Sequence, residues 1–182
     1  MLFSHLPWIL ALVWLVVRWV VGGRLDVDSA QNVGVLTNML FILLLVFVGI
    51  NMHYRKLQGK ASGFFEDFKA CMKPALLYVL PTLVFIGVYY AYIGDDIQEL
   101  RTAYIDTFET GIQDEANLTT FLADHPELKG KSKEELMRMN RENVERNVSV
   151  KTRLMGGSLA LTFIAFGYSL LAVFFWRTFG RK

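Results

Sequence analysis

The sequence predicts an all-α polytopic membrane protein, with four transmembrane helices and a helical extramembrane hairpin between the third and the fourth. Two observations predict it. Hydrophobic residues make up 53% of the 182 residues, which is more than an ordinary soluble domain contains. They lie in four blocks, whereas 13 of the 17 acidic and 9 of the 19 basic residues fall between Asp95 and Arg153. We expect one membrane domain over residues 1–182, with residues 95–153 outside the bilayer.

Each apolar block comes close to the ~20 helical residues that cross a ~30 Å hydrocarbon core. The expected spans are residues 6–23, 33–52, 74–93 and 154–176. The first has no lysine or arginine before Arg18 and no small-residue cleavage pattern after it, so we interpret it as a retained span and not as a signal peptide. Pro81 lies inside the third span, where a membrane helix tolerates a kink.

Basic residues near the spans indicate the topology, because they remain on the cytoplasmic side. They are Arg55, Lys56, Lys60, Lys69, Lys73, Arg177, Arg181 and Lys182. We therefore expect both termini and the second connection to be cytoplasmic.

Within that connection, the sequence of residues 64–72 predicts a short amphipathic helix on the membrane surface, with a simple turn as the alternative. Aromatic rings mark the two interfaces: Trp8 and Trp176 on one side, and Trp19, Tyr89, Tyr90 and Tyr92 on the other.

The polar segment between the third and fourth spans has its own helix signals. Asp95 and Asp96 are suitable caps for a helix with one apolar face, formed by Ile97, Leu100, Tyr104, Phe108 and Ile112. Ser132 and Glu135 fit a capping box. No proline follows Lys133, so we expect its helix to run into the fourth span, with a kink at Gly156 and Gly157 and with residues 118–126 as the corner of the hairpin.

A stripe of small residues in the fourth span predicts close helix packing, because small side chains let helix backbones approach in lipid. Its members are Ser158, Thr162, Ala165, Ser169 and Ala172, and Gly87 and Ala91 in the third span form a shorter pair. We expect the two surfaces to match. The stripe either packs within its own bundle, the favoured interpretation, or faces another subunit.

The spans contain few groups for chemistry. Arg18 lies near the end of its span, where reaching to the headgroups is the simpler interpretation and contact with an anionic lipid or a partner's carboxylate is the alternative. No aspartate, glutamate, histidine or lysine falls within the expected spans, which argues against an ion-coupled carrier. The polar residues deep in them are Thr37, Asn38 and Thr82, for which we expect hydrogen bonds between helices.

Other classes of site are excluded or weak. His5, His53 and His125 lie outside the expected spans, which argues against haem, and the lone Cys71 excludes a disulfide or a multi-cysteine metal site. The scattered bases exclude a nucleic-acid partner. A site at His53, Asp95 and Asp96 is the weak catalytic or metal alternative, so we expect no catalytic residue, no cofactor and no metal. Asn140, Asn143 and Asn147 share a helix face, either solvated or for docking a partner.

The chain resembles a bacterial inner-membrane family catalogued only as a domain of unknown function, number forty-one ninety-nine. The residues that carry the resemblance are Gly49-Ile50, Tyr54-Arg55, Gly59, Ser62, Phe64 to Lys69 and Asp95. Gly63 interrupts the family's Ser-Phe step, and Asp96 stands where the family has a proline. The resemblance implies a four-helix bacterial inner-membrane protein with no assigned activity.

The sequence therefore predicts a non-enzymatic interaction or accessory subunit, whose hairpin and small-residue stripe contact another membrane protein or a second copy. The alternative is a small transporter or channel with its path near Asn38 and Thr82, which could form an oligomer. A lipid-modifying enzyme using His53 and Asp95 is a third, weaker hypothesis.

Overall fold

The computed structural model describes residues 2–58 and 60–180, with side chains from His5 onward. The predicted features Gly59, Arg181 and Lys182 lie outside the described residues. The chain divides into two compact units. The membrane unit comprises the described residues before Asp95 and those from Leu154 onward, and the polar unit comprises residues 95–153. Each unit is described by itself.

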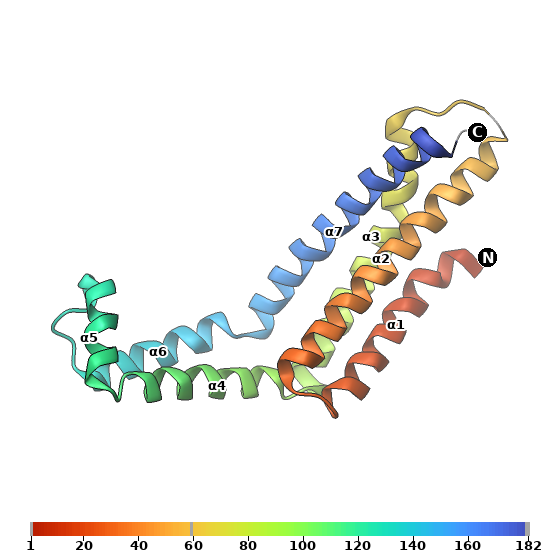
Figure 1. Ribbon diagram of the computed structural model, residues 1–182. Helices are drawn as coiled ribbons and strands as arrows, with labels where there is room; N and C mark the ends of the chain where they lie inside the picture. Colours follow the sequence, from red (N-terminus) through yellow and green to blue (C-terminus); the bar gives the residue numbers. More distant parts are fainter. Residues whose placement is uncertain (1, 59, 181–182) are drawn as a thin grey trace. The chain divides into compact units, whose positions relative to one another are not determined.

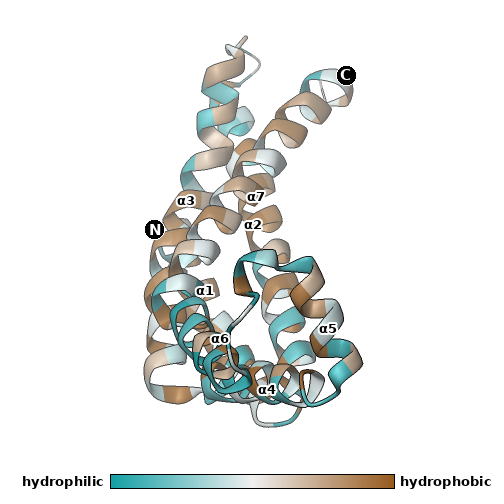
Figure 2. Ribbon diagram, turned by 90° about the vertical axis from the view of Figure 1, so that its left-hand side faces the viewer, coloured by the Kyte–Doolittle hydropathy of each residue, from teal (hydrophilic) through white to brown (hydrophobic). Residues whose placement is uncertain are grey.

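Four long helices form the membrane unit, α1 (Leu2–Gly22), α2 (Val27–Leu57), α3 (Phe64–Val88) and α7 (Val150–Phe179), and a π-helical turn, η1 (Tyr89–Ile93), extends α3 (Figure 1). All four are long and apolar enough to cross a bilayer. This confirms the predicted all-α polytopic fold. Figure 2 shows hydrophobic residues predominating on these helices, whereas hydrophilic residues concentrate on the helices of the polar unit.

The membrane helices are longer than the predicted spans, and the difference matters most in α3. The prediction of a separate surface helix over residues 64–72 is wrong, because these residues are the first turns of α3. Pro74 does not end the helix. A proline removes one hydrogen bond to the carbonyl four residues earlier, here that of Ala70, and a neighbouring helix can compensate for this within a membrane.

Gly49 of α2 is the neighbour of this proline site. A Cβ placed at Gly49 would lie 2.9 Å from Cγ of Pro74 and closer still to the Ala70 carbonyl oxygen. Only a glycine therefore allows α2 to approach α3 where the proline interrupts its hydrogen bonding. Helices α1, α2 and α3 pack on one another around a common core that includes Ile42, Leu45, Tyr78 and Ala75.

The polar unit contains α4 (Asp96–Gly111), α5 (Glu115–Asp124), a 3-10 turn, η2 (Pro126–Leu128), and α6 (Lys133–Asn147). The Ser132 capping box is confirmed: Ser132 Oγ accepts from the Glu135 N–H, and Glu135 Oε2 accepts from the Ser132 N–H. Asp95 occupies the N-cap position of α4, but its side chain forms no capping hydrogen bond. The predicted corner, residues 118–126, is largely helical because Asp114 caps α5 through the Ala116 N–H.

The predicted continuous helix from Lys133 into the fourth span is wrong. Helix α6 ends at Asn147, and α7 begins at Val150. Ser149 explains the break, because its Oγ accepts from the Thr152 N–H and so caps a new helix. The predicted kink at Gly156 and Gly157 is therefore unnecessary, and both glycines lie inside α7.

Two arginines join α4 to α6. Arg101 of α4 donates from Nε to the Val148 carbonyl at 2.7 Å and from Nη2 to the Glu145 carbonyl at 3.2 Å. These are carbonyls at the end of α6, which lack partners within the helix and favour a positive charge. Arg141 of α6 donates from Nε to Glu109 Oε1 at 2.6 Å. The pair is thus fixed at two points along its length.

Substitution of Gly49 with alanine should destabilise the protein by about 2 kcal/mol, because the methyl group overpacks the contact between α2 and α3. The midpoint of thermal unfolding in detergent measures the effect. Gly156→Ala is the matched control, since no atom lies within 4 Å of a Cβ placed there. Equal midpoints for the two variants would disprove the close contact.

The hydrogen bond from Arg141 lowers the pKa of Glu109 below its ordinary value of 4.5. An NMR titration of the Glu109 carboxyl should therefore show a midpoint below 4.5, and Arg141→Gln should return it toward that value. The ion pair stabilises the folded protein fully above pH 4.5, and this contribution is lost as the pH falls through the lower folded pKa. A wild-type midpoint at or above 4.5 would contradict the contact.

Candidate functional site: the buried Asp67 cluster

Asp67 lies in the first turns of α3 and is 0% exposed. Its carboxylate accepts hydrogen bonds from Tyr54 Oη at 2.9 Å, from Arg177 Nε at 2.7 Å and from Ser62 Oγ. Asp67 lies outside the expected third span, residues 74–93, which contains no acidic residue. It belongs to the same helix, because α3 begins at Phe64, well before the apolar window that starts at Pro74.

The donors around Asp67 come from three different segments. Tyr54 lies near the end of α2, Ser62 lies in the connection before α3, and Arg177 lies in the last turn of α7. Arg177 also donates from Nη2 to the Ser62 carbonyl at 2.6 Å. One carboxylate therefore joins three helices at the same end of the membrane unit, where the chain also connects α2 to α3 (Figure 1).

A histidine and three aromatic rings complete the cluster. His53 Nε2 lies 3.2 Å from Asp67 Oδ1 without hydrogen-bond geometry, so the attraction is electrostatic when the ring is protonated. Tyr54 stacks on Trp176 with ring centroids 5.6 Å apart. The Arg177 guanidinium lies 5.8 Å from the centroid of the Phe64 ring. Asp67 is thus fully enclosed, whereas the Arg177 side chain stays 30% exposed.

The arrangement of these groups suits an anchor between helices better than a catalytic site. Ser62 donates to Asp67 and not to His53, so the three do not form a nucleophile activated by a base. The carboxylate has an arginine and two hydroxyl groups as partners. Among the described residues, no group of three or more histidine, cysteine, aspartate or glutamate side chains could hold a metal ion. Asp67 therefore anchors the end of α7 to α2 and α3.

Arg18 lies inside the membrane unit and not at its surface. It is 2% exposed, so the structure corrects both the expectation that it reaches the headgroups and the alternative of an anionic lipid or a partner's carboxylate. Gly34 makes room for Arg18, because a Cβ placed there would lie 3.2 Å from Arg18 Cδ, and Gly22 makes room for Tyr89, because a Cβ there would clash with Tyr89 Oη. The guanidinium lies 4.9 Å from the Tyr89 ring centroid. Tyr89 is consequently buried, unlike the exposed interface ring that we expected.

The small-residue stripe of α7 is only partly buried. Ala165, Ser169 and Ala172 are buried in the core of the membrane unit, Ser158 is half-buried, and Thr162 is exposed. Gly87 faces Leu154, because a Cβ placed at Gly87 would lie 3.7 Å from both methyl groups of that leucine. Ala91 is exposed in η1.

The remaining predicted polar residues differ in their surroundings. Tyr78 Oη donates to Asn38 Oδ1 at 2.5 Å, which joins α3 to α2 as expected. Thr82 and Thr37 instead donate to carbonyls of their own helices. His5 and His53 lie outside the expected spans but within the longer helices α1 and α2, and His125 follows the end of α5. Asp95 and Asp96 belong to the polar unit, whereas His53 belongs to the membrane unit. Asn140 is half-buried, and Asn143 and Asn147 are exposed.

Replacing Asp67 with asparagine should destabilise the protein by about 3 kcal/mol, because Arg177 loses its counter-charge. The sole cysteine, Cys71, is buried one turn further along α3, so its maleimide labelling in detergent should accelerate in the variant. Glu66→Gln is the matched control at the exposed neighbouring position. Wild-type labelling rate and stability in Asp67→Asn would rule out an anchoring role for the carboxylate.

Searches of family models, curated proteins and solved structures found no match for this chain. The assignment as a multi-pass membrane protein accordingly rests on its own four helices.

Proposed function

We propose that this protein is a non-enzymatic accessory subunit of a bacterial inner-membrane complex, in which the polar unit binds a partner protein. Three features of that unit support the proposal. Its helices are too short and too charged to cross a bilayer. Helix α6 begins with a complete capping box. Arginines within the unit join α4 to α6. A unit of this kind can present a defined surface outside the lipid.

Tyr104 is the observation that carries the proposal. It lies on α4 and is 54% exposed, and it is the only exposed large apolar side chain among residues 95–153, all of which the structure describes. The sequence places it on the apolar face of α4, yet it remains uncovered. Tyrosine is enriched among the few residues that dominate protein interfaces, because it offers a large apolar ring and a hydroxyl group.

The position of polar groups in the membrane unit favours this function over transport. Carriers place their coupling residues near the middle of the bilayer. Near the middle of α3, the polar contact is the uncharged pair of Tyr78 and Asn38. Asp67 lies at the start of α3, where its hydrogen bonds to Arg177, Tyr54 and Ser62 suit an anchor.

The proposal includes a topology with both termini in the cytoplasm and the polar unit in the periplasm. Five bases between Arg55 and Lys73 support it, because basic residues near short connections stay in the cytoplasm. Membership of the bacterial family that the sequence resembles is part of the same proposal.

A pull-down through a C-terminal tag, after gentle detergent extraction from the native membrane, tests the function. We expect a stoichiometric partner with the wild-type protein and at least a tenfold weaker recovery with Tyr104→Ala, as truncation of a central interface tyrosine produces. Tyr92→Ala is the matched control, because this tyrosine is 86% exposed in the membrane unit. Recovery of a monomer or homo-oligomer alone would refute the accessory role and favour the transporter alternative.

A further inference from the structure

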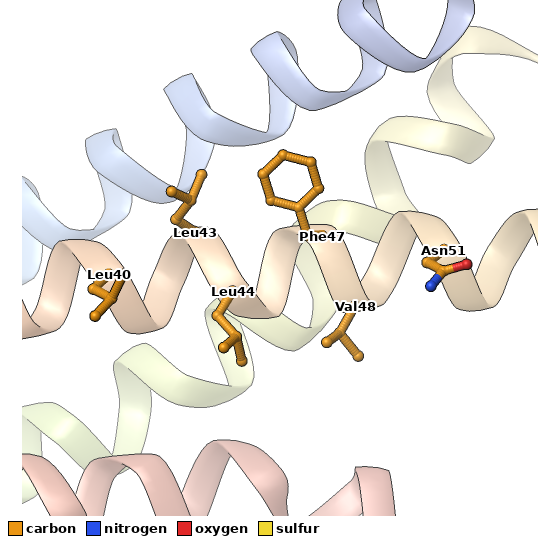
Figure 3. A pocket seen from close by; sticks show the side chains of 6 residues that line it. All are labelled: Leu40, Leu43, Leu44, Phe47, Val48 and Asn51. Atoms are coloured by element: carbon orange, nitrogen blue, oxygen red, sulfur yellow. The ribbon is translucent and has the colours of Figure 1, made fainter. Parts of the chain in front are cut away.

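A continuous apolar groove runs along the outer surface of α2. Its apolar part is lined by Leu40, Leu43, Leu44, Phe47, Val48 and Asn51. Figure 3 shows that these side chains come from successive turns of α2, with Leu43 and Phe47 on one side of the helix and Leu44 and Val48 on the other. A second depression shares Val48 and Asn51 with it and continues to Met52, Arg55 and Lys56. The groove therefore passes from apolar to amide to basic side chains.

The length of the groove matches one leaflet of a bilayer. Leu40 and Asn51 are eleven residues apart, which is ~16 Å along an α-helix at 1.5 Å per residue. Half of a ~30 Å hydrocarbon core is ~15 Å. When the apolar part of the groove spans the acyl region, Asn51 lies at its boundary and Arg55 lies one turn further, at the depth of the phosphate groups.

The basic end of the groove is available for an anion. Arg55 and Lys56 are both exposed, and within the described part of the chain neither side chain forms a hydrogen bond or an ion pair. Arginine and lysine bind phosphate oxygens through charge-assisted hydrogen bonds. A similar depression on α3 also combines basic and apolar side chains, Lys69 and Lys73 with Met72, Leu76, Leu77 and Leu80.

We propose that the α2 groove binds one anionic phospholipid, with an acyl chain along Leu40 to Val48 and the phosphate on Arg55 and Lys56. The charges select this occupant. A second copy of the chain packed here by the same surface would bring two further bases against these two, which repel one another. A zwitterionic lipid would fill the apolar part equally well, but it supplies less net negative charge to the basic end. This inference is independent of the proposed function.

Native mass spectrometry of the full chain in detergent tests the site, with phosphatidylglycerol and phosphatidylcholine of identical acyl chains as probes. The wild-type protein should retain phosphatidylglycerol preferentially. Arg55→Gln should lower this preference about fivefold, the effect of one basic residue near an anionic lipid surface. Lys60→Gln is the matched control, because it removes the same charge just beyond the end of α2, at a residue that lines neither part of the groove. The lipid preference of this variant should change less than twofold.

A second pair of variants tests the apolar part. Leu44→Trp fills the groove and should reduce retention of both lipids, whereas Leu36→Trp, at an exposed position of α2 outside the groove, should not. Equal retention of the two lipids by the wild-type protein would overturn the proposal. So would equal effects of Arg55→Gln and Lys60→Gln, or complete displacement of the lipid by soluble glycerol phosphate, which has a phosphate without acyl chains.

Discussion

The ion pair between Asp67 and Arg177 determines how the last membrane helix is held. A carboxylate removed from water is costly unless a cation and hydrogen-bond donors replace the lost hydration. Asp67 has both, because Arg177, Tyr54 and Ser62 all donate to it. Helices in lipid gain little from the hydrophobic effect when they associate, so a directional polar contact of this kind can fix the register of α7 against α2 and α3. The small residues Ala165 and Ser169 of α7 are also buried in the membrane unit.

The two units use different interactions for the same purpose. In the membrane unit, Gly34 leaves space for the buried Arg18, and Gly49 lets α2 approach α3 at Pro74. Polar groups there are enclosed by neighbouring helices. In the polar unit, short helices start at side-chain caps and are joined by arginines at the surface. Water competes for the surface contacts of the polar unit, but hardly for the enclosed contacts of the membrane unit. The polar unit therefore depends more on pH and salt than the membrane unit does.

Local signals account for what could be predicted from the sequence. Four apolar blocks indicate four spans, and Ser132 with Glu135 indicates a helix start, because each depends on residues close together in the chain. The Asp67 cluster depends on residues far apart, since Asp67 and Arg177 are separated by 110 positions. The apolar window that defines a span also begins after Asp67, which hid the acid. Similarly, nothing near Arg18 in the sequence indicates that Gly34 of another helix accommodates its side chain.

The separation of Asp67 from Arg177 has a consequence for biosynthesis. At 5 to 20 residues per second, a ribosome makes Arg177 about 5 to 20 s after Asp67. Tyr54 and Ser62 are made just before Asp67 and can bind the carboxylate at once, but its cation arrives only 110 residues later. Until then the nascent protein carries an acid whose charge is not neutralised at the membrane surface. A chain that stops before Arg177 therefore lacks the cation that pairs with Asp67.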